Sequence, residues 1–338
     1  MFHAFLLKRL GPALLTGLWL SSPSALAGGA RAAMLLPGGI NDQSWNQDGY
    51  AGLIRIKQLG FEVAYSENVS VADHVEALRD YARQGYNLII GHSGRFLSAE
   101  QRVGPSFPAV QFITGAGSAG SGKNVLSIDF NNRHFGCLLG VLAAGMTKSG
   151  KIAGVYGLEG LPTTVDQAGS FRVCAQKAHP AIEVTLLYVM DMEDASSARE
   201  AAFSVIAAGA DVVVGQLNAG HVGLLQAAKE RNVFVTGRSA AHTAIAPRQV
   251  LTNVIEKWPE MYAAVARDVA AGKISAGYRV YGLDTAASSG AELRYSAEQA
   301  YNEKVPSALI ADMDLWSKRL AQGALVVVPT REDAHGGR

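Results

Sequence analysis

The segment GGINDQSWN (residues 38–46) places a carboxylate, several amides and an indole directly after an apolar run. An indole offers a flat face for stacking, and neighbouring carboxylates and amides can hydrogen-bond the edge of a small, polar, flat ligand. Asp42 could instead only cap the helix that follows, and Trp45 could belong to the core. Because Ser44 is an equally good cap and the neighbours of Trp45 are polar, we expect Asp42, Trp45 and Asn46 to form one wall of a binding site.

Polar side chains also follow the later apolar runs of the chain. In doubly wound sheets, ligands bind outside the carboxyl ends of the strands, so these positions are candidates for the same site. The site residues that we predict from these positions are Asp42, Trp45, Asn46, Ser93, Asp129, Met192, Asn218 and Arg238. We add Glu256 from the family resemblance described below. Other candidates at strand ends are Arg95, Thr163, Asp191, Asp194 and Gln216. Structural alternatives remain, because Ser93 could only shape a turn, Asp129 could cap a helix and Met192 could be core.

No catalytic motif is complete. GHSGR (residues 91–95) resembles a nucleophile elbow, but that motif needs glycine where Arg95 stands, and no triad partners are evident. Glycines 154, 157 and 160 do not have the spacing of a dinucleotide-binding loop. The eight histidines are scattered, and neither cysteine has a partner at metal-ligand spacing. We therefore expect no catalysis, no cofactor and no metal.

The amino terminus has the pattern of a secretory signal. Lys8 and Arg9 precede a short apolar stretch, and residues 25–27 read Ala-Leu-Ala, so we expect cleavage after residue 27 and a periplasmic protein. The sequence shows no cysteine near that point to carry a lipid anchor. A formal net charge of +1 without a basic block argues against nucleic-acid binding.

Short apolar runs alternate with amphipathic helical segments along the rest of the chain. One series of strand, helix and strand runs to Gly150, and a second starts at Lys151. Such alternation predicts parallel sheets covered by helices, and its repetition predicts two domains. Cys137 and Cys174 both fall in predicted helices, where an oxidising compartment would permit a bridge. We favour two buried free thiols, since a chain of this size can build its core without a bridge.

The opening segment resembles the first motif of the basic-membrane-protein (BMP) family of ABC-transporter substrate-binding proteins, which reads G-G-x-x-D-x-S-[FW]-N-x-x-x-x-x-G. The residues that match are Gly38, Gly39, Asp42, Ser44, Trp45, Asn46 and Gly52. The likeness continues through TKSGKIAGVYG (147–157), GADVVV (209–214), QAAKERNVFVTG (226–237) and LTNVIEKWPEMY (251–262). It implies a type I periplasmic-binding fold, in which two doubly wound parallel-sheet lobes are joined by three chain crossings and close on the ligand.

The resemblance also implies the lobes and the partners. We expect residues 28–128 plus about 252–281 in the first lobe, 129–251 plus about 282–329 in the second, and a disordered tail over 330–338. It implies a purine base or nucleoside as ligand, with Trp45 stacking on the base. An ABC permease in the inner membrane would be the partner, and we expect a monomer. Alternatives are a ligand-binding partner of a membrane sensor and, less favoured, a secreted hydrolase.

The sequence departs from the nucleoside-binding members of this family at two places. They tend to carry an aspartate that holds the ribose where TGRSAAH here has Arg238 and Ser239. They also tend to carry a lysine near the position where this chain has Glu256. Here the nearest lysine, Lys257, comes one residue later. These changes favour a free base over a nucleoside and leave the other half of the ligand unidentified.

Overall fold

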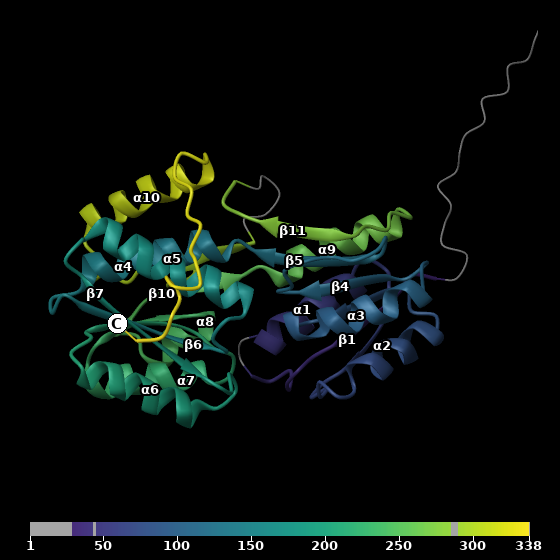
Figure 1. Cartoon of the computed structure of the whole chain (residues 1–338), viewed down its shortest axis with the longest axis horizontal. Coiled ribbons are helices and arrows are strands. Elements are labelled where there is room, and N and C mark those ends of the chain that lie inside the picture. Colours follow the sequence, from purple (N-terminus) through teal and green to yellow (C-terminus); the bar gives the residue numbers. More distant parts are fainter. Residues whose placement is uncertain (1–28, 43–44, 285–289, 338) are drawn as a thin grey trace, which may run out of the picture.

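The computed structural model describes residues 29–42, 45–284 and 290–337. Two lobes lie side by side, each built on a six-stranded sheet covered by helices (Figure 1). The first sheet has the order β11-β5-β4-β3-β1-β2 and the second the order β12-β10-β9-β8-β6-β7. All strand pairs in the described residues are parallel except β10 with β12. The two doubly wound lobes predicted from the sequence are confirmed.

The strands of the first lobe are β1 (Arg31–Leu35), β2 (Glu62–Ser66), β3 (Leu88–Gly91), β4 (Gln111–Gly115), β5 (Val125–Phe130) and β11 (Gly277–Tyr281). Those of the second are β6 (Lys151–Gly157), β7 (Glu183–Val189), β8 (Val212–Gln216), β9 (Phe234–Gly237), β10 (Val250–Glu256) and β12 (Ala291–Arg294). Every residue of β3, β4 and β5 is buried, as expected where helices cover both faces of a parallel sheet.

Helices follow most of the strands in both lobes. In the first lobe these are α1 (Trp45–Lys57), α2 (His74–Arg83), α3 (Leu97–Val103) and α9 (Trp258–Ala270), with short 3-10 turns over Gly94–Phe96 and Gly104–Ser106. In the second they are α4 (Asn132–Met146), α5 (Pro162–Ala178), α6 (Ala195–Ala207), α7 (His221–Arg231), α8 (Ala240–Ile245) and α10 (Ser307–Ala321). No helix in the described ranges is long and apolar enough to cross a membrane.

The chain passes between the lobes three times. The first passage follows β5, the second lies between β10 and α9, and the third lies between β11 and β12. We expected residues from about 252 to lie in the first lobe, but β10 pairs with β9 and β12 in the second sheet, so that boundary is wrong. The return comes at Lys257, after which α9 packs against α1.

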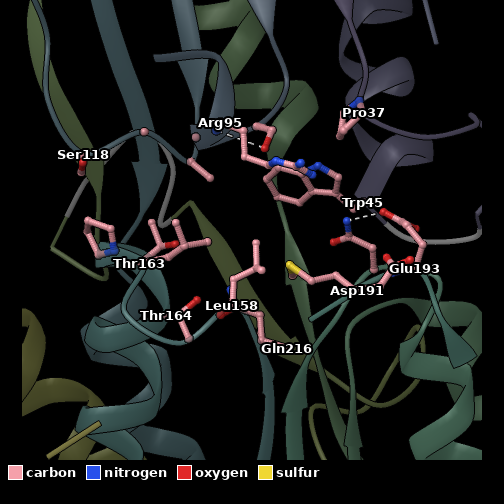
Figure 2. A pocket seen from close by; sticks show the side chains of 18 of the residues that line it. Pro37, Trp45, Arg95, Ser118, Leu158, Thr163, Thr164, Asp191, Glu193 and Gln216 are labelled. Atoms are coloured by element: carbon pink, nitrogen blue, oxygen red, sulfur yellow. Dashed lines mark hydrogen bonds between the residues drawn. The ribbon is translucent and has the colours of Figure 1, made fainter. Parts of the chain in front are cut away.

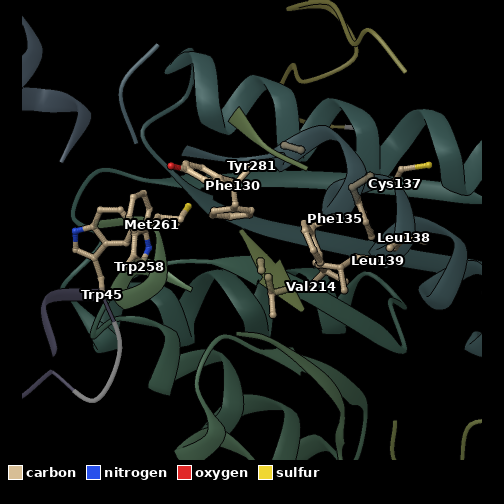
Figure 3. Close-up of a cluster of buried hydrophobic side chains, with 14 of the residues drawn as sticks. Trp45, Phe130, Phe135, Cys137, Leu138, Leu139, Val214, Trp258, Met261 and Tyr281 are labelled. Carbon is tan, nitrogen blue, oxygen red and sulfur yellow. The ribbon is translucent and has the colours of Figure 1, made fainter. Parts of the chain in front are cut away.

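One cluster of buried side chains runs through the passage between the lobes. It extends from Trp45 and Trp258 past Phe130 and Tyr281 to Phe135 (Figure 3). Apolar side chains from both lobes therefore pack against one another where the chain passes between the lobes.

Helices α4 and α5 pack closely in the second lobe and are joined by a disulfide between Cys137 and Cys174. A Cβ on Gly136 would lie 2.2 Å from the carbonyl oxygen of Gln167, so glycine permits this close approach. The expectation of two free thiols is wrong. The sequence placed both cysteines in helices, but it did not show that the two helices are neighbours.

Residues 330–337 pack against the second lobe, contrary to the expectation of a disordered tail, and Arg338 lies outside the described residues. The Arg172 guanidinium donates hydrogen bonds to the carbonyl oxygens of Asp333, His335 and Gly337, at 2.9–3.0 Å. Ala334 is buried against the second lobe. Because the buried Arg172 guanidinium donates to several backbone carbonyl oxygens, it holds this polar segment against the second lobe.

Candidate functional site

A cleft that opens to solvent lies between the lobes (Figure 2). Its walls come from the carboxyl ends of strands in both sheets, where ligands of doubly wound proteins bind. The first lobe contributes Pro37, Trp45, Ser93, Gly94, Arg95, Ala116, Gly117 and Ser118. The second contributes Leu158, Leu161, Pro162, Thr163, Thr164, Met190, Asp191, Met192, Glu193, Gln216, Asn218 and Arg238.

Trp45 forms the aromatic part of the cleft wall. Its indole stacks on the imidazole of His92 with ring centroids 4.1 Å apart, and Trp258 meets it edge-on at 5.1 Å. The indole N–H donates to the carbonyl oxygen of His92 at 3.0 Å. Burial lowers the pKa of His92 to about 4, so the imidazole is neutral near pH 7. The indole is therefore fixed from behind by an uncharged ring.

Asp42 and Asn46 support the loop before Trp45, and neither lines the cleft. The Asp42 carboxylate accepts hydrogen bonds from the backbone N–H groups of Asn46 and Gln47, at 2.8 and 3.0 Å, which is the geometry of a helix cap. The Asn46 amide donates to Asp42 and accepts from the N–H of Gly38. We expected Ser44 to be the cap, and Ser44 lies outside the described residues.

Arg238 lines the cleft, and its guanidinium is already held by protein groups. It donates to the carboxylate of Glu256 and, at 3.0 Å, to the carbonyl oxygen of Leu217. The second Glu256 oxygen accepts from the indole N–H of Trp258 at 2.6 Å. Arg238 and Glu256 are both buried, so the pair is shielded from water. A hydrogen-bonded chain thus runs from the cleft wall of the second lobe to the aromatic cluster behind Trp45.

Asp129 is fully buried and does not line the cleft. It accepts from the backbone N–H of Phe130 and from the side-chain amide of Asn132, both at 2.8 Å. Burial and the charge of Glu256 hold the pKa of Asp129 well above its ordinary value. The cap of α4 is Asn131, whose side chain accepts from the N–H of His134, so the capping alternative for Asp129 is wrong. Asp129 instead holds Phe130 and Asn132 together where the chain first leaves the first lobe.

The loop after β7 carries Asp191, Met192 and Glu193 into the cleft. The Glu193 carboxylate accepts from the side-chain amide of Asn218 at 2.6 Å and from the N–H of Ala219 at 3.2 Å. Burial raises the pKa of Glu193, while these two bonds act in the opposite direction. Sequence reasoning chose Asp194 at this turn.

Asp194 instead caps α6 through bonds to the N–H groups of Ser196 and Ser197. Aspartate is a much better helix cap than glutamate, so capping preference could have separated the two residues. Glu193 is the functional candidate that sequence reasoning missed.

Hydroxyl groups also line the cleft. They belong to Ser93, Ser118, Thr163 and Thr164, and the exposed Arg95 lies two residues after Ser93. The Ser93 hydroxyl accepts from the N–H of Arg95 at 3.3 Å, so it also shapes the turn. The structure therefore brings Trp45, Ser93, Met192, Asn218 and Arg238 to one cleft and places Asp42, Asn46, Asp129 and Glu256 behind its walls.

No group of three or more histidine, cysteine or acidic side chains that could hold a metal ion occurs in the described part of the chain. The wall combines one indole, amides, hydroxyls and charged groups. Such a set can stack on a flat molecule and hydrogen-bond its edges.

A family model described as "ABC transporter substrate-binding protein PnrA-like" matches residues 30–311. The chain belongs to this Bmp family. Family members bind a solute for an ABC transporter, in agreement with a cleft between two lobes and with the resemblance of the opening motif. The type I periplasmic-binding fold is likewise confirmed by the solved structure described below.

Two relatives of this Bmp protein illustrate the range of names in the family. It is 26% identical over 257 residues to the transcriptional activator protein med of Bacillus subtilis, covering 75% of this chain and 80% of the relative. It is 28% identical over 214 residues to a purine-binding protein of Brucella abortus, covering 62% of this chain and 59% of the relative.

A solute-binding protein of an ABC transporter system from Aeropyrum pernix has the same fold, with a TM-score of 0.77. That match has 20% identity and covers 89% of this chain and 94% of the other.

Proposed function

We propose that this protein captures a purine base or nucleoside between its lobes and delivers it to an ABC permease. The observation that carries the proposal is the Trp45 indole, which lines the cleft while His92 fixes it from behind. Stacking of a base on an aromatic side chain is worth about 1–3 kcal/mol. The amides, carboxylates and hydroxyls around the indole would hydrogen-bond the polar edges of the base.

The B. abortus relative is named a purine-binding protein, which supports a purine as the ligand. The pairing of Arg238 with Glu256 supports a free base, because Arg238 stands where the family's nucleoside binders tend to carry a ribose-holding aspartate. The hydroxyl groups that line the cleft would hydrogen-bond the ribose if the ligand were a nucleoside. No bond of the ligand has to break, so we propose binding without catalysis, by a monomer in the periplasm.

Mass spectrometry of small molecules released from the purified protein tests this function. We expect a purine base or nucleoside, and a purine should also raise the melting temperature when added, because a ligand that binds only the folded state stabilises it. A released sugar or amino acid, together with no thermal shift by any purine, would contradict the proposal.

A second candidate is a ligand-binding partner of a membrane sensor. The relative named as a transcriptional activator favours it, since that name describes regulation rather than transport. Genomic neighbours separate the two candidates. Permease and ATPase genes beside this one support transport, and a kinase or cyclase gene supports sensing.

A further inference from the structure

Glu193 is held in a fixed position on the cleft wall. Its carboxylate accepts from Asn218 at 2.6 Å and from the N–H of Ala219 at 3.2 Å, and its own N–H donates to Asp191 at 2.9 Å. Figure 2 shows the Glu193–Asn218 bond on the same side of the cleft as Trp45. Because each of its two carboxylate oxygens accepts a hydrogen bond, Glu193 presents its carboxylate to a ligand in a defined orientation.

The Glu193 carboxylate keeps unused acceptor capacity. A carboxylate offers about four lone-pair positions, and the two bonds in the described part of the chain occupy two of them. The charges of Asp42 and Asp191 act on Glu193 with the same sign, so the surroundings add further negative potential. A ligand edge placed there must therefore donate hydrogen bonds.

We propose that Glu193 is a specificity-determining residue that selects heterocycles with two adjacent N–H donors on one edge. Guanine is the purine base with this edge, because its ring N–H lies beside its exocyclic amino group. A planar carboxylate can accept two parallel N–H groups at once, which gives both strength and geometric selectivity. Hypoxanthine keeps only the ring donor, and adenine places an acceptor nitrogen beside its amino group. This inference rests on the proposed function, since it requires a flat base against Trp45.

Fluorescence titrations of guanine, hypoxanthine and adenine test the inference on the wild type and on Glu193→Gln. The wild type should bind guanine about tenfold to a hundredfold more tightly than hypoxanthine, since a bond to a charged group would be lost. Glu193→Gln should lower guanine affinity by about tenfold or more and bring the two bases within about threefold of each other. Glu230→Gln is the matched control, because Glu230 pairs with Arg199 on the surface of the same lobe.

Three results would overturn the inference, and they separate it from the proposed function. Equal affinities of the wild type for guanine and hypoxanthine would refute the selectivity while leaving purine binding intact. An equal loss for all three bases in Glu193→Gln, with a lowered melting temperature, would make Glu193 only a brace for Asn218 and Ala219. Binding of no purine by the wild type would remove the proposed function and this inference together.

Discussion

The indole of Trp45 and the imidazole of His92 lie almost parallel, inclined by 16° with their centroids 4.1 Å apart. His92 is itself held by Tyr262, whose hydroxyl lies 2.6 Å from Nδ1, and by the carbonyl oxygen of Trp45 at 2.8 Å from Nε2. The aromatic wall of the cleft is thus backed by a second ring that hydrogen bonds hold in place.

We expect Trp45→Ala to weaken purine binding at least about tenfold, since base stacking contributes about 1–3 kcal/mol. Titration calorimetry measures the effect, and circular dichroism checks that the mutant is folded. Tyr65→Ala is the control, because Tyr65 is 41% exposed and lies outside the cleft. Normal binding by Trp45→Ala would show that the indole is not the stacking surface.

Arg238→Met should lower the free energy of unfolding by about 3–5 kcal/mol, because it leaves the Glu256 carboxylate buried without its cation. The double mutant Arg238→Met, Glu256→Gln should lose much less free energy of unfolding than the sum of the losses in Arg238→Met alone and Glu256→Gln alone. Urea denaturation measures the three values. The exposed pair Arg199–Glu230 is the comparison, and its removal should cost less than about 1 kcal/mol. A single mutant as stable as the wild type would contradict this account.

We expect the disulfide between Cys137 and Cys174 to raise the free energy of unfolding. Cys137 and Cys174 are 37 residues apart, and closing a loop of that length stabilises a fold by about 3–5 kcal/mol in the chain-entropy model. The double mutant Cys137→Ala, Cys174→Ala should therefore unfold at lower urea, and reductant should lower the wild-type midpoint in the same direction. Thiol titration of unreduced, unfolded protein should find no free thiol, and two free thiols would refute the bridge.

Asp48 should make stability depend on pH. Burial raises its pKa to about 8, with Glu256 adding to the shift and Arg238 opposing it. Because the folded state holds a proton that the unfolded chain has released, stability should fall as the pH rises from about 4 to about 8. Asp48→Asn should flatten this slope and raise the melting temperature near pH 8.

Glu100 is also buried with a pKa raised to about 8, so part of the slope should remain in Asp48→Asn. Glu100→Gln is the matched variant in the core of the first lobe. Melting curves from pH 5 to pH 8 measure both effects. An Asp48→Asn curve parallel to the wild type would show that Asp48 is ionised throughout this range.

The alternation of apolar runs and helical segments, together with the polar residues that follow each strand, predicts from the sequence where the cleft lies. Trp45, Met192, Asn218 and Arg238 lie on its wall as a ligand site requires, because the carboxyl ends of parallel strands meet at one edge. Their roles toward a ligand remain predictions. The pattern of apolar runs was sufficient for the lobes because it reflects burial on both faces of each sheet.

Contacts between distant residues could not be predicted in the same way. The sequence predicts that Asp42 and Asn46 bind the ligand, but in the structure they hydrogen-bond each other and the backbone. The sequence likewise predicts Glu256 as a site residue, but its carboxylate is bonded to Arg238 and Trp258 behind the cleft wall. Sequence spacing reports the side of an element on which a residue lies, and tertiary packing decides what it contacts.

Calorimetric titration of the wild-type protein with purine bases, purine nucleosides and a hexose tests the central claim most directly. The account predicts saturable binding of one purine per chain, with no heat from the hexose. Saturable binding of the hexose, with no binding of any purine base or nucleoside, would contradict it.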